Sequence, residues 1–255
     1  MRKTTFTLLL GALAAITLIT ASAADAATTV RVDGDGQAGW LFNRDTTTTT
    51  PYTFTTADHS IGNGSIYVLP IGSNPSDKFI AEQFLATPVN QVQSIAYDFK
   101  VAGNGTAADG DQFYLNVYAN IDNSDNFYDC RFDYVPTTGS TTAWTTASFS
   151  ATDTPVNVRQ RGTRIGAPGS CPTTLAGMPA GSYVHFFSLS VGDTTASDAG
   201  LAGFYDKVVV NLTGGTTVYD FEASPSSKDA CKNGGWVAFG FKNQGDCIQF
   251  VNTGK

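Results

Sequence analysis

Apolar and polar side chains alternate along several segments of the chain, a pattern typical of β-strands with one buried and one solvated face. In residues 112–120 every second side chain is apolar, and the intervening polar face carries Tyr114, Asn116, Tyr118 and Asn120. Residues 94–101 and 127–135 follow the same rule. The polar side chains of these two segments are Asp98, Lys100, Asp129, Arg131 and Asp133. The alternation predicts three half-buried strands.

Further short runs are rich in β-branched and aromatic residues, the types enriched in strands. They are residues 64–69, 78–84, 143–149, 155–160, 183–191, 201–212 and 217–222. Clusters of Gly, Asn, Asp and Ser separate the runs and indicate turns. No segment before Ser224 has a long helical period. We therefore expect an all-β fold, an antiparallel β-sandwich built as a jelly roll or as another Greek key.

The first residues have the features of a secretory signal peptide. Arg2 and Lys3 precede an apolar run from Phe6 to Thr20, and small residues follow it. The run is shorter than the roughly 20 apolar residues that a membrane anchor needs, so we expect export and cleavage. The predicted parts are a signal peptide at 1–26, a sandwich domain at 27–223 and a C-terminal element at 224–255. The expected location is secreted, extracellular or at the surface of a bacterial cell, with no membrane span after cleavage.

The net charge of the chain limits the classes of partner that it can be expected to bind. Its 15 Lys and Arg residues against 22 Asp and Glu residues give a formal net charge of -7. Nucleic-acid binding proteins carry a basic patch or stripe instead, so no nucleic-acid partner is expected. Only 15% of the residues are charged. Such a polar but weakly charged surface suits neutral ligands, and its acidity is compatible with calcium, which takes oxygen ligands.

Four cysteines in an exported chain predict two disulfides, for which three pairings are possible. Proximity in sequence favours Cys130–Cys171 and Cys231–Cys247. Loop entropy assigns about 4 kcal/mol to the first and about 3 kcal/mol to the second. A zinc site at the second pair would need four close ligands, and the two histidines of the chain, His59 and His185, are distant in sequence.

The segment GLAGFYDKVVVNLTGGTTVYDFE, residues 200–222, resembles the closing strands of bacterial jelly rolls of the carbohydrate-binding type. GWLFNRD at 39–45 and GNGSIYVLP at 62–70 resemble opening strands of the same class. Together with the strand count, this resemblance favours the jelly roll. It also implies a structural calcium ion held by Asp206, with Asp33 or Asp35 as a further ligand. The alternative is that Asp206 caps a turn or pairs with neighbours of Lys207.

The tail CKNGGWVAFGFKNQGDC, from Cys231 to Cys247, resembles a short C-terminal element of many secreted bacterial proteins, an element of unknown activity. Gly234 and Gly235 allow a turn, while Trp236 and other aromatic residues supply apolar anchors. A short helical turn is expected around Ile248 and Val251, which are three residues apart. We expect a compact disulfide-linked knob. It either clasps one end of the sandwich or serves as a binding or surface-attachment element.

No motif has the specificity of a catalytic signature, so no catalytic residue is assigned. Asp129 and Asp133 lie four positions apart on one strand, about 13 Å, which exceeds either carboxylate separation used by glycosidases. Glu82 and Glu222 have no partner that the sequence identifies. A polysaccharide hydrolase or lyase is therefore the least favoured function.

A binding surface is the favoured hypothesis. If the three alternating strands are neighbours, their polar faces form one surface on which aromatic rings cover sugar faces and fixed polar groups meet hydroxyls. The candidate ligand-binding residues are Tyr114, Asn116, Tyr118, Arg131 and Asp133. The expected partner is a polysaccharide or cell-surface glycan. The alternatives are an ordinary solvated sheet face and a structural protein of the extracellular matrix or cell surface.

Overall fold

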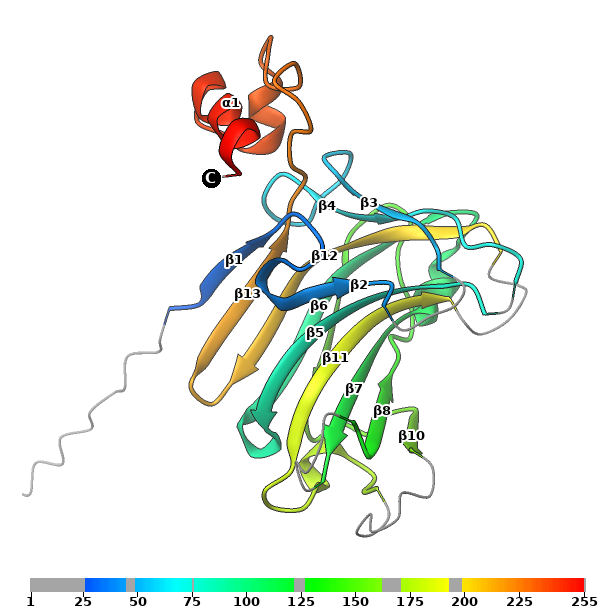
Figure 1. Ribbon diagram of the computed structural model, residues 1–255. Coiled ribbons are helices and arrows are strands. Elements are labelled where there is room, and N and C mark those ends of the chain that lie inside the picture. Colours follow the sequence, from blue (N-terminus) through cyan, green and yellow to red (C-terminus); the bar gives the residue numbers. More distant parts are fainter. Residues whose placement is uncertain are drawn as a thin grey trace, which may run out of the picture.

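The computed structural model describes residues 26–44, 49–74, 76–121, 127–161, 171–192 and 199–254. The chain forms a jelly-roll β-sandwich of two sheets, followed by a small C-terminal element (Figure 1). The predicted signal peptide lies outside the described residues, apart from Ala26. Within the described part of the chain, no helix is both long and apolar enough to cross a membrane.

The first sheet has long β12 at its centre. Its strands are β1 (Thr28–Val32), β13 (Gly215–Phe221), β12 (Leu201–Leu212), β4 (Ser65–Val68), β3 (Tyr52–Thr55), β6 (Val92–Gly103) and β9 (Thr145–Ser150). One edge of β12 pairs with β4 near its start and with β13 near its end, and β6 also pairs with β12. All pairs in this sheet are antiparallel except β1 with β13.

The second sheet is a single antiparallel path. In spatial order its strands are β10 (Asn157–Gln160), β8 (Cys130–Tyr134), β7 (Phe113–Asn120), β11 (Tyr183–Gly192), β5 (Lys78–Pro88) and β2 (Trp40–Phe42). The connections hold short 3-10 helices: η1 (Gln37–Gly39), η2 (Val89–Gln91), η3 (Ala107–Gln112) and η4 (Leu175–Gly177). The predicted antiparallel β-sandwich is confirmed.

Aromatic side chains dominate the interior between the sheets. Trp40 of β2 meets Phe187 of β11 edge-on at 5.7 Å between ring centroids and Phe221 of β13 at 4.9 Å. Phe113 of β7 stacks on Phe99 of β6 at 5.2 Å. All five rings are fully buried. The sheets are therefore joined by ring contacts, each of which contributes roughly 0.5–1.5 kcal/mol beyond its buried area.

The predicted strands at 64–69, 78–84, 112–120, 127–135, 143–149, 155–160, 183–191, 201–212 and 217–222 are all present, with ends shifted by a few residues. The three alternating strands are not all neighbours, as the hypothesis of a single surface required. The strand predicted at 94–101 is β6, which lies in the first sheet between β12 and β9, whereas β7 and β8 are neighbours in the second. Alternation assigns residues to faces of a strand but cannot say which strands pair.

Both predicted disulfides are confirmed. Cys130 of β8 is bonded to Cys171, 41 positions along the chain, and Cys231 is bonded to Cys247 within the C-terminal element. That element contains η6 (Gly235–Phe239) and α1 (Gln244–Thr253), so the predicted helical turn is also confirmed.

The C-terminal element projects beyond the end of the sandwich near β1 and β4, and α1 packs on η6 of the same element (Figure 1). Its contacts with the sandwich include the guanidinium of Arg31, 6.0 Å from the ring centroid of Phe250. The backbone of Gly240 also approaches the side chain of Asn63. These local contacts favour a projecting element over a clasp that covers the core.

Candidate functional site

The candidate site is the face of the second sheet that points away from the first sheet, here called the outer face. Cross-strand register places two rows of side chains on it. The first row runs through Glu82, Ser188, Asn116, Asp133 and Asn157. The second row runs through Phe84, Phe186, Tyr118, Arg131 and Arg159. Because neighbouring strands are about 4.8 Å apart, side chains within a row can touch.

A cavity of about 290 Å³ opens on the β7–β8–β10 part of this face. Its polar lining includes Lys78, Tyr114, Asn116, Arg131, Asp133 and Arg159. Four of the five residues predicted from sequence therefore line one cavity, and the fifth, Tyr118, lies opposite Arg131 in the register. Sequence placed these residues on strand faces, and the pairing of β7 with β8 brings them together.

Asp133 is the centre of the polar network in this cavity. Its Oδ1 accepts hydrogen bonds from Asn116 Nδ2 at 2.8 Å and from Arg131 Nε at 2.7 Å. Its Oδ2 accepts from Arg131 Nη2 at 3.0 Å and from Arg159 Nε at 3.1 Å. Asp133 is only 5% exposed, and its carboxylate is held by two guanidinium groups. Asp133 therefore orients Arg131 and Arg159 toward the cavity.

An aromatic row continues from this cavity toward β5. Tyr118 stacks on Phe186 with ring centroids 4.1 Å apart and an angle of 15° between the planes. Phe84 lies next to Phe186 at 5.7 Å and is 53% exposed. Tyr128 contacts the other side of Tyr118 edge-on at 4.8 Å. These ring contacts form an aromatic platform whose end at Phe84 is exposed to solvent.

Burial raises the pKa of Tyr118 to about 12. The phenol therefore stays protonated over the physiological range and keeps its O–H group as a donor. Tyr114 is held in position by its hydroxyl group, which donates a hydrogen bond to the carbonyl of Gly192 at 3.1 Å. Both tyrosines are thus held in place by the sheet around them.

Two polar residues of the three-strand surface lie elsewhere because β6 belongs to the first sheet. Lys100 pairs with Asp58 at 2.7 Å, and Asp98 pairs with Lys207 at 2.9 Å. Asp129, which precedes β8, accepts from the backbone N–H of Ile121 at 2.9 Å and is buried. The surface predicted from the three strands is therefore smaller, and neighbours from β5, β10 and β11 complete it.

Sequence reasoning missed Phe84, Phe186 and Arg159 as site residues. Arg159 alternates with Val158 in a predicted strand, so its face could be inferred but its neighbour could not. Phe186 is harder, because β11 has a register shift between Val184 and Phe186. Val184 and Phe187 are both buried, so two inward positions of β11 are three residues apart at this point, and Phe186 faces outward with Ser188.

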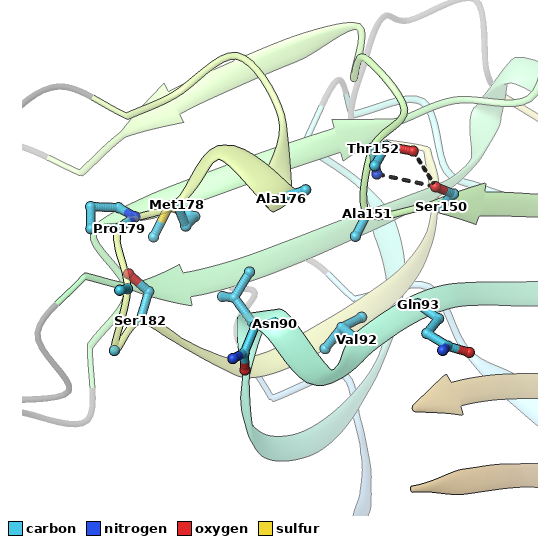
Figure 2. A pocket seen from close by; sticks show the side chains of 13 residues that line it. Asn90, Val92, Gln93, Ser150, Ala151, Thr152, Ala176, Met178, Pro179 and Ser182 are labelled. Atoms are coloured by element: carbon cyan, nitrogen blue, oxygen red, sulfur yellow. Dashed lines mark hydrogen bonds between the residues drawn. The ribbon is translucent and has the colours of Figure 1, made fainter. Parts of the chain in front are cut away.

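A second cavity, of about 420 Å³, lies where the β5–β6 turn approaches the end of β9 and residues 176–182. Figure 2 shows its lining side chains, with Ser150 hydrogen-bonded to Thr152 across one wall. No charged side chain is among its lining residues. Ser182 donates to the carbonyl of Ile121 at 3.2 Å. Since these hydroxyl groups already have protein partners, this cavity presents fewer groups for ligand recognition than the outer face.

The first sheet also carries an aromatic cluster on its outward side. Tyr67 and Phe204 lie 4.8 Å apart, and Trp144 is 6.1 Å from Phe204. The indole of Trp144 donates to Asp58 at 2.9 Å. All three rings are only partly exposed. This cluster lacks an open aromatic end comparable to Phe84 and provides a matched control surface.

The three residues predicted to bind calcium each interact with different protein groups. Asp206 is fully buried, and its Oδ2 accepts from the backbone N–H groups of Ser60 at 2.8 Å and Ile61 at 3.0 Å. Asp33 pairs with Arg31 at 3.2 Å. Asp35 accepts from the backbone N–H of Phe42 and pairs with Arg44. This engagement agrees with the turn-holding alternative for Asp206.

No group of three His, Cys, Asp or Glu side chains among the described residues is arranged to hold a metal ion. Structural calcium stays a prediction from the sequence resemblance. Calcium titration followed by thermal melting tests it, and an unchanged melting temperature would remove the idea.

No family model and no curated protein matches the sequence. Among solved structures, the CBM22-1 xylan-binding domain of Paenibacillus barcinonensis Xyn10C is 12% identical, with a TM-score of 0.40 over 71% of this chain and 90% of that domain. The enzymatically active domain of bacteriophage CBA120 tailspike protein 4 is 13% identical, with a TM-score of 0.40 over 70% of this chain and 20% of that one. A CBM4 structure is 13% identical, with a TM-score of 0.29 over 70% of this chain and 92% of that chain.

Proposed function

We propose that this chain is an exported bacterial, non-catalytic carbohydrate-binding protein whose ligand lies across the outer face of the second sheet. One observation supports the proposal: an aromatic row runs from the exposed Phe84 to Tyr118, which lies opposite Arg131 in a cavity lined by fixed polar groups. A sugar has an apolar ring face and a rim of hydroxyl groups. Aromatic surface and a few well-placed polar groups are the complement that such a ligand needs.

The arrangement of carboxylates supports a non-catalytic role. Glu82 and Asp133 share a row but are separated by three strand spacings, or about 14 Å. Glycosidases hold their two carboxyl groups at most about 9.5 Å apart. The carboxylate of Asp133 is also occupied by four donors. Neither group is therefore placed as a partner for acid–base chemistry on a glycosidic bond.

Export is supported by the composition of the chain rather than by the site. The disulfides Cys130–Cys171 and Cys231–Cys247 are typical of proteins in an oxidising compartment. The basic start, apolar run and small residues at 1–26 have the order of a secretory leader. An exported binding protein would meet polysaccharides or cell-surface glycans.

The test is binding of the purified mature chain to a panel of soluble and insoluble polysaccharides. Phe84→Ala should lower affinity about tenfold, or 1.4 kcal/mol, because it removes the open end of the platform. Tyr67→Ala, a change in the aromatic cluster of the first sheet, should leave binding unchanged. Failure of the wild-type chain to bind any polysaccharide would end the proposal. Stable self-association without glycan affinity would favour a structural surface protein.

A further inference from the structure

The cavity on the outer face has more cationic than anionic side chains. Lys78, Arg131 and Arg159 line it together with the carboxylates of Asp111 and Asp133. The whole chain has a net charge of -7. An excess of positive charge in one cavity of an acidic protein is therefore a local feature that the overall composition does not explain.

The two arginines are direct cross-strand partners, Arg159 on β10 opposite Arg131 on β8. Like charges in this relation destabilise a sheet unless an anion lies between them. Asp133 is that anion, but it carries one charge for two guanidinium groups. With Asp111 and Lys78 included, the cavity still has one more cationic than anionic side chain, and an anionic ligand would complete the neutralisation.

The hydrogen-bond acceptor sites of Asp133 are also fully occupied. A carboxylate offers about four lone-pair sites, and Asp133 receives four donors from Asn116, Arg131 and Arg159. A ligand in the cavity therefore meets donors rather than this acceptor.

Arg159 has donor capacity to spare. Its side chain is 62% exposed, and only its Nε is bonded, to Asp133. Within the described part of the chain its Nη groups have no protein acceptor, and neither does Nη1 of Arg131. Planar guanidinium groups bind carboxylates through paired, charge-assisted hydrogen bonds.

We propose that this cavity binds the carboxylate of an acidic sugar, so that the glycan recognised by the outer face contains uronic acid residues. This inference rests on the proposed function and specifies its ligand class. Arg159 and Arg131 would hold the carboxylate, while the aromatic row Phe84, Phe186 and Tyr118 would support neighbouring sugar rings.

The experiment compares polygalacturonate with the same polymer after reduction of its carboxyl groups, by titration calorimetry on the mature chain. Binding of polygalacturonate should be at least about tenfold tighter than binding of the reduced polymer and should weaken as salt rises. Arg159→Gln should lower the affinity for polygalacturonate about tenfold, and Arg159→Lys should lower it less. Lys232→Gln, which removes one exposed charge from the C-terminal element, should have no effect.

The outcomes separate this inference from the proposed function. Equal binding of the charged and reduced polymers, with no effect of Arg159→Gln, would overturn the acidic ligand and leave carbohydrate binding in place. Binding of a sulfated glycan as tightly as polygalacturonate would overturn the assignment to a carboxylate. Absence of binding to all polysaccharides, neutral or charged, would overturn both.

Discussion

Phe186 of β11 and Tyr118 of β7 stack nearly parallel on the outer face of the second sheet, with ring centroids 4.1 Å apart. The contact fixes the middle of the aromatic row. Tyr118 is only 7% exposed, whereas Phe84 at the end of the row is 53% exposed. Buried and exposed positions are thus separated along one row: Tyr118 supports the neighbouring rings, and Phe84 is the ring open to solvent.

Tyr118→Ala should lower stability by about 3 kcal/mol, because it removes a buried aromatic side chain. Tyr118→Phe keeps the ring and should change stability by less than about 1 kcal/mol. Chemical denaturation of both variants measures the difference. Since burial raises the pKa of Tyr118 to about 12, glycan affinity should show no change from ionisation of this phenol between pH 7 and 9.5. Equal losses in the two variants would show that the hydroxyl, not stacking, is the stabilising group.

Asp133→Ala should destabilise the sandwich by about 2 kcal/mol, since it leaves the half-buried guanidinium of Arg131 without its partner and opposite Arg159. For a domain of this size this is roughly a 4–8 °C fall in melting temperature. Arg159→Ala removes a largely exposed side chain and should change the melting temperature by less than about 2 °C. Differential scanning calorimetry gives both values. Similar small effects in both variants would contradict the central role of Asp133.

The acidic side chains near the 58–64 loop should make the free energy of unfolding decrease as pH rises from about 4 to 7, the range in which they lose their protons. Burial, and then the neighbouring Glu222, raise the pKa of Asp220 to about 6, and burial raises the pKa of Asp206 to a similar value. An acid whose pKa is higher in the folded state stabilises that state at low pH and loses this contribution as pH rises through the folded pKa.

Asp220→Asn should therefore stabilise the protein by about 1 kcal/mol at pH 8, after allowance for solvent screening, or about 2–4 °C in melting temperature. At pH 4 it should have little effect, because the wild-type group is then protonated. Asp229→Asn, at an exposed site, is the control and should be neutral at both pH values. A stabilising effect of Asp220→Asn at pH 4 would argue against the raised pKa.

Deletion of residues 226–255 should leave the melting temperature of the sandwich within about 2 °C of the full chain. The core residues are enclosed by the two sheets, and the C-terminal element contacts the sandwich locally, as Phe250 does at Arg31. Thermal melts of the two proteins test this. A fall of more than roughly 5 °C would identify the element as a clasp, while unchanged melting with lost cell-surface retention would identify an attachment element.

The sequence alone was sufficient for the local features of the fold. The alternation in residues 112–120 identified β7 and its two faces, because side chains in a strand point to opposite sides by geometry. The cysteine pairs were also predictable, since Cys231 and Cys247 lie close along the chain. The same local rules placed Tyr114, Asn116 and Tyr118 together on one face.

Only the tertiary structure decided which faces meet. Residues 94–101 show the same alternation as residues 112–120, yet β6 lies in the opposite sheet. The register shift in β11 leaves Val184 and Phe187 both buried, so the outward position of Phe186 does not follow from the alternation at the start of that strand. Strand order and register depend on contacts between segments far apart in sequence, and period-two alternation contains no information about them. The joining of Arg131, Asp133 and Arg159 in one cavity is a consequence of that long-range pairing.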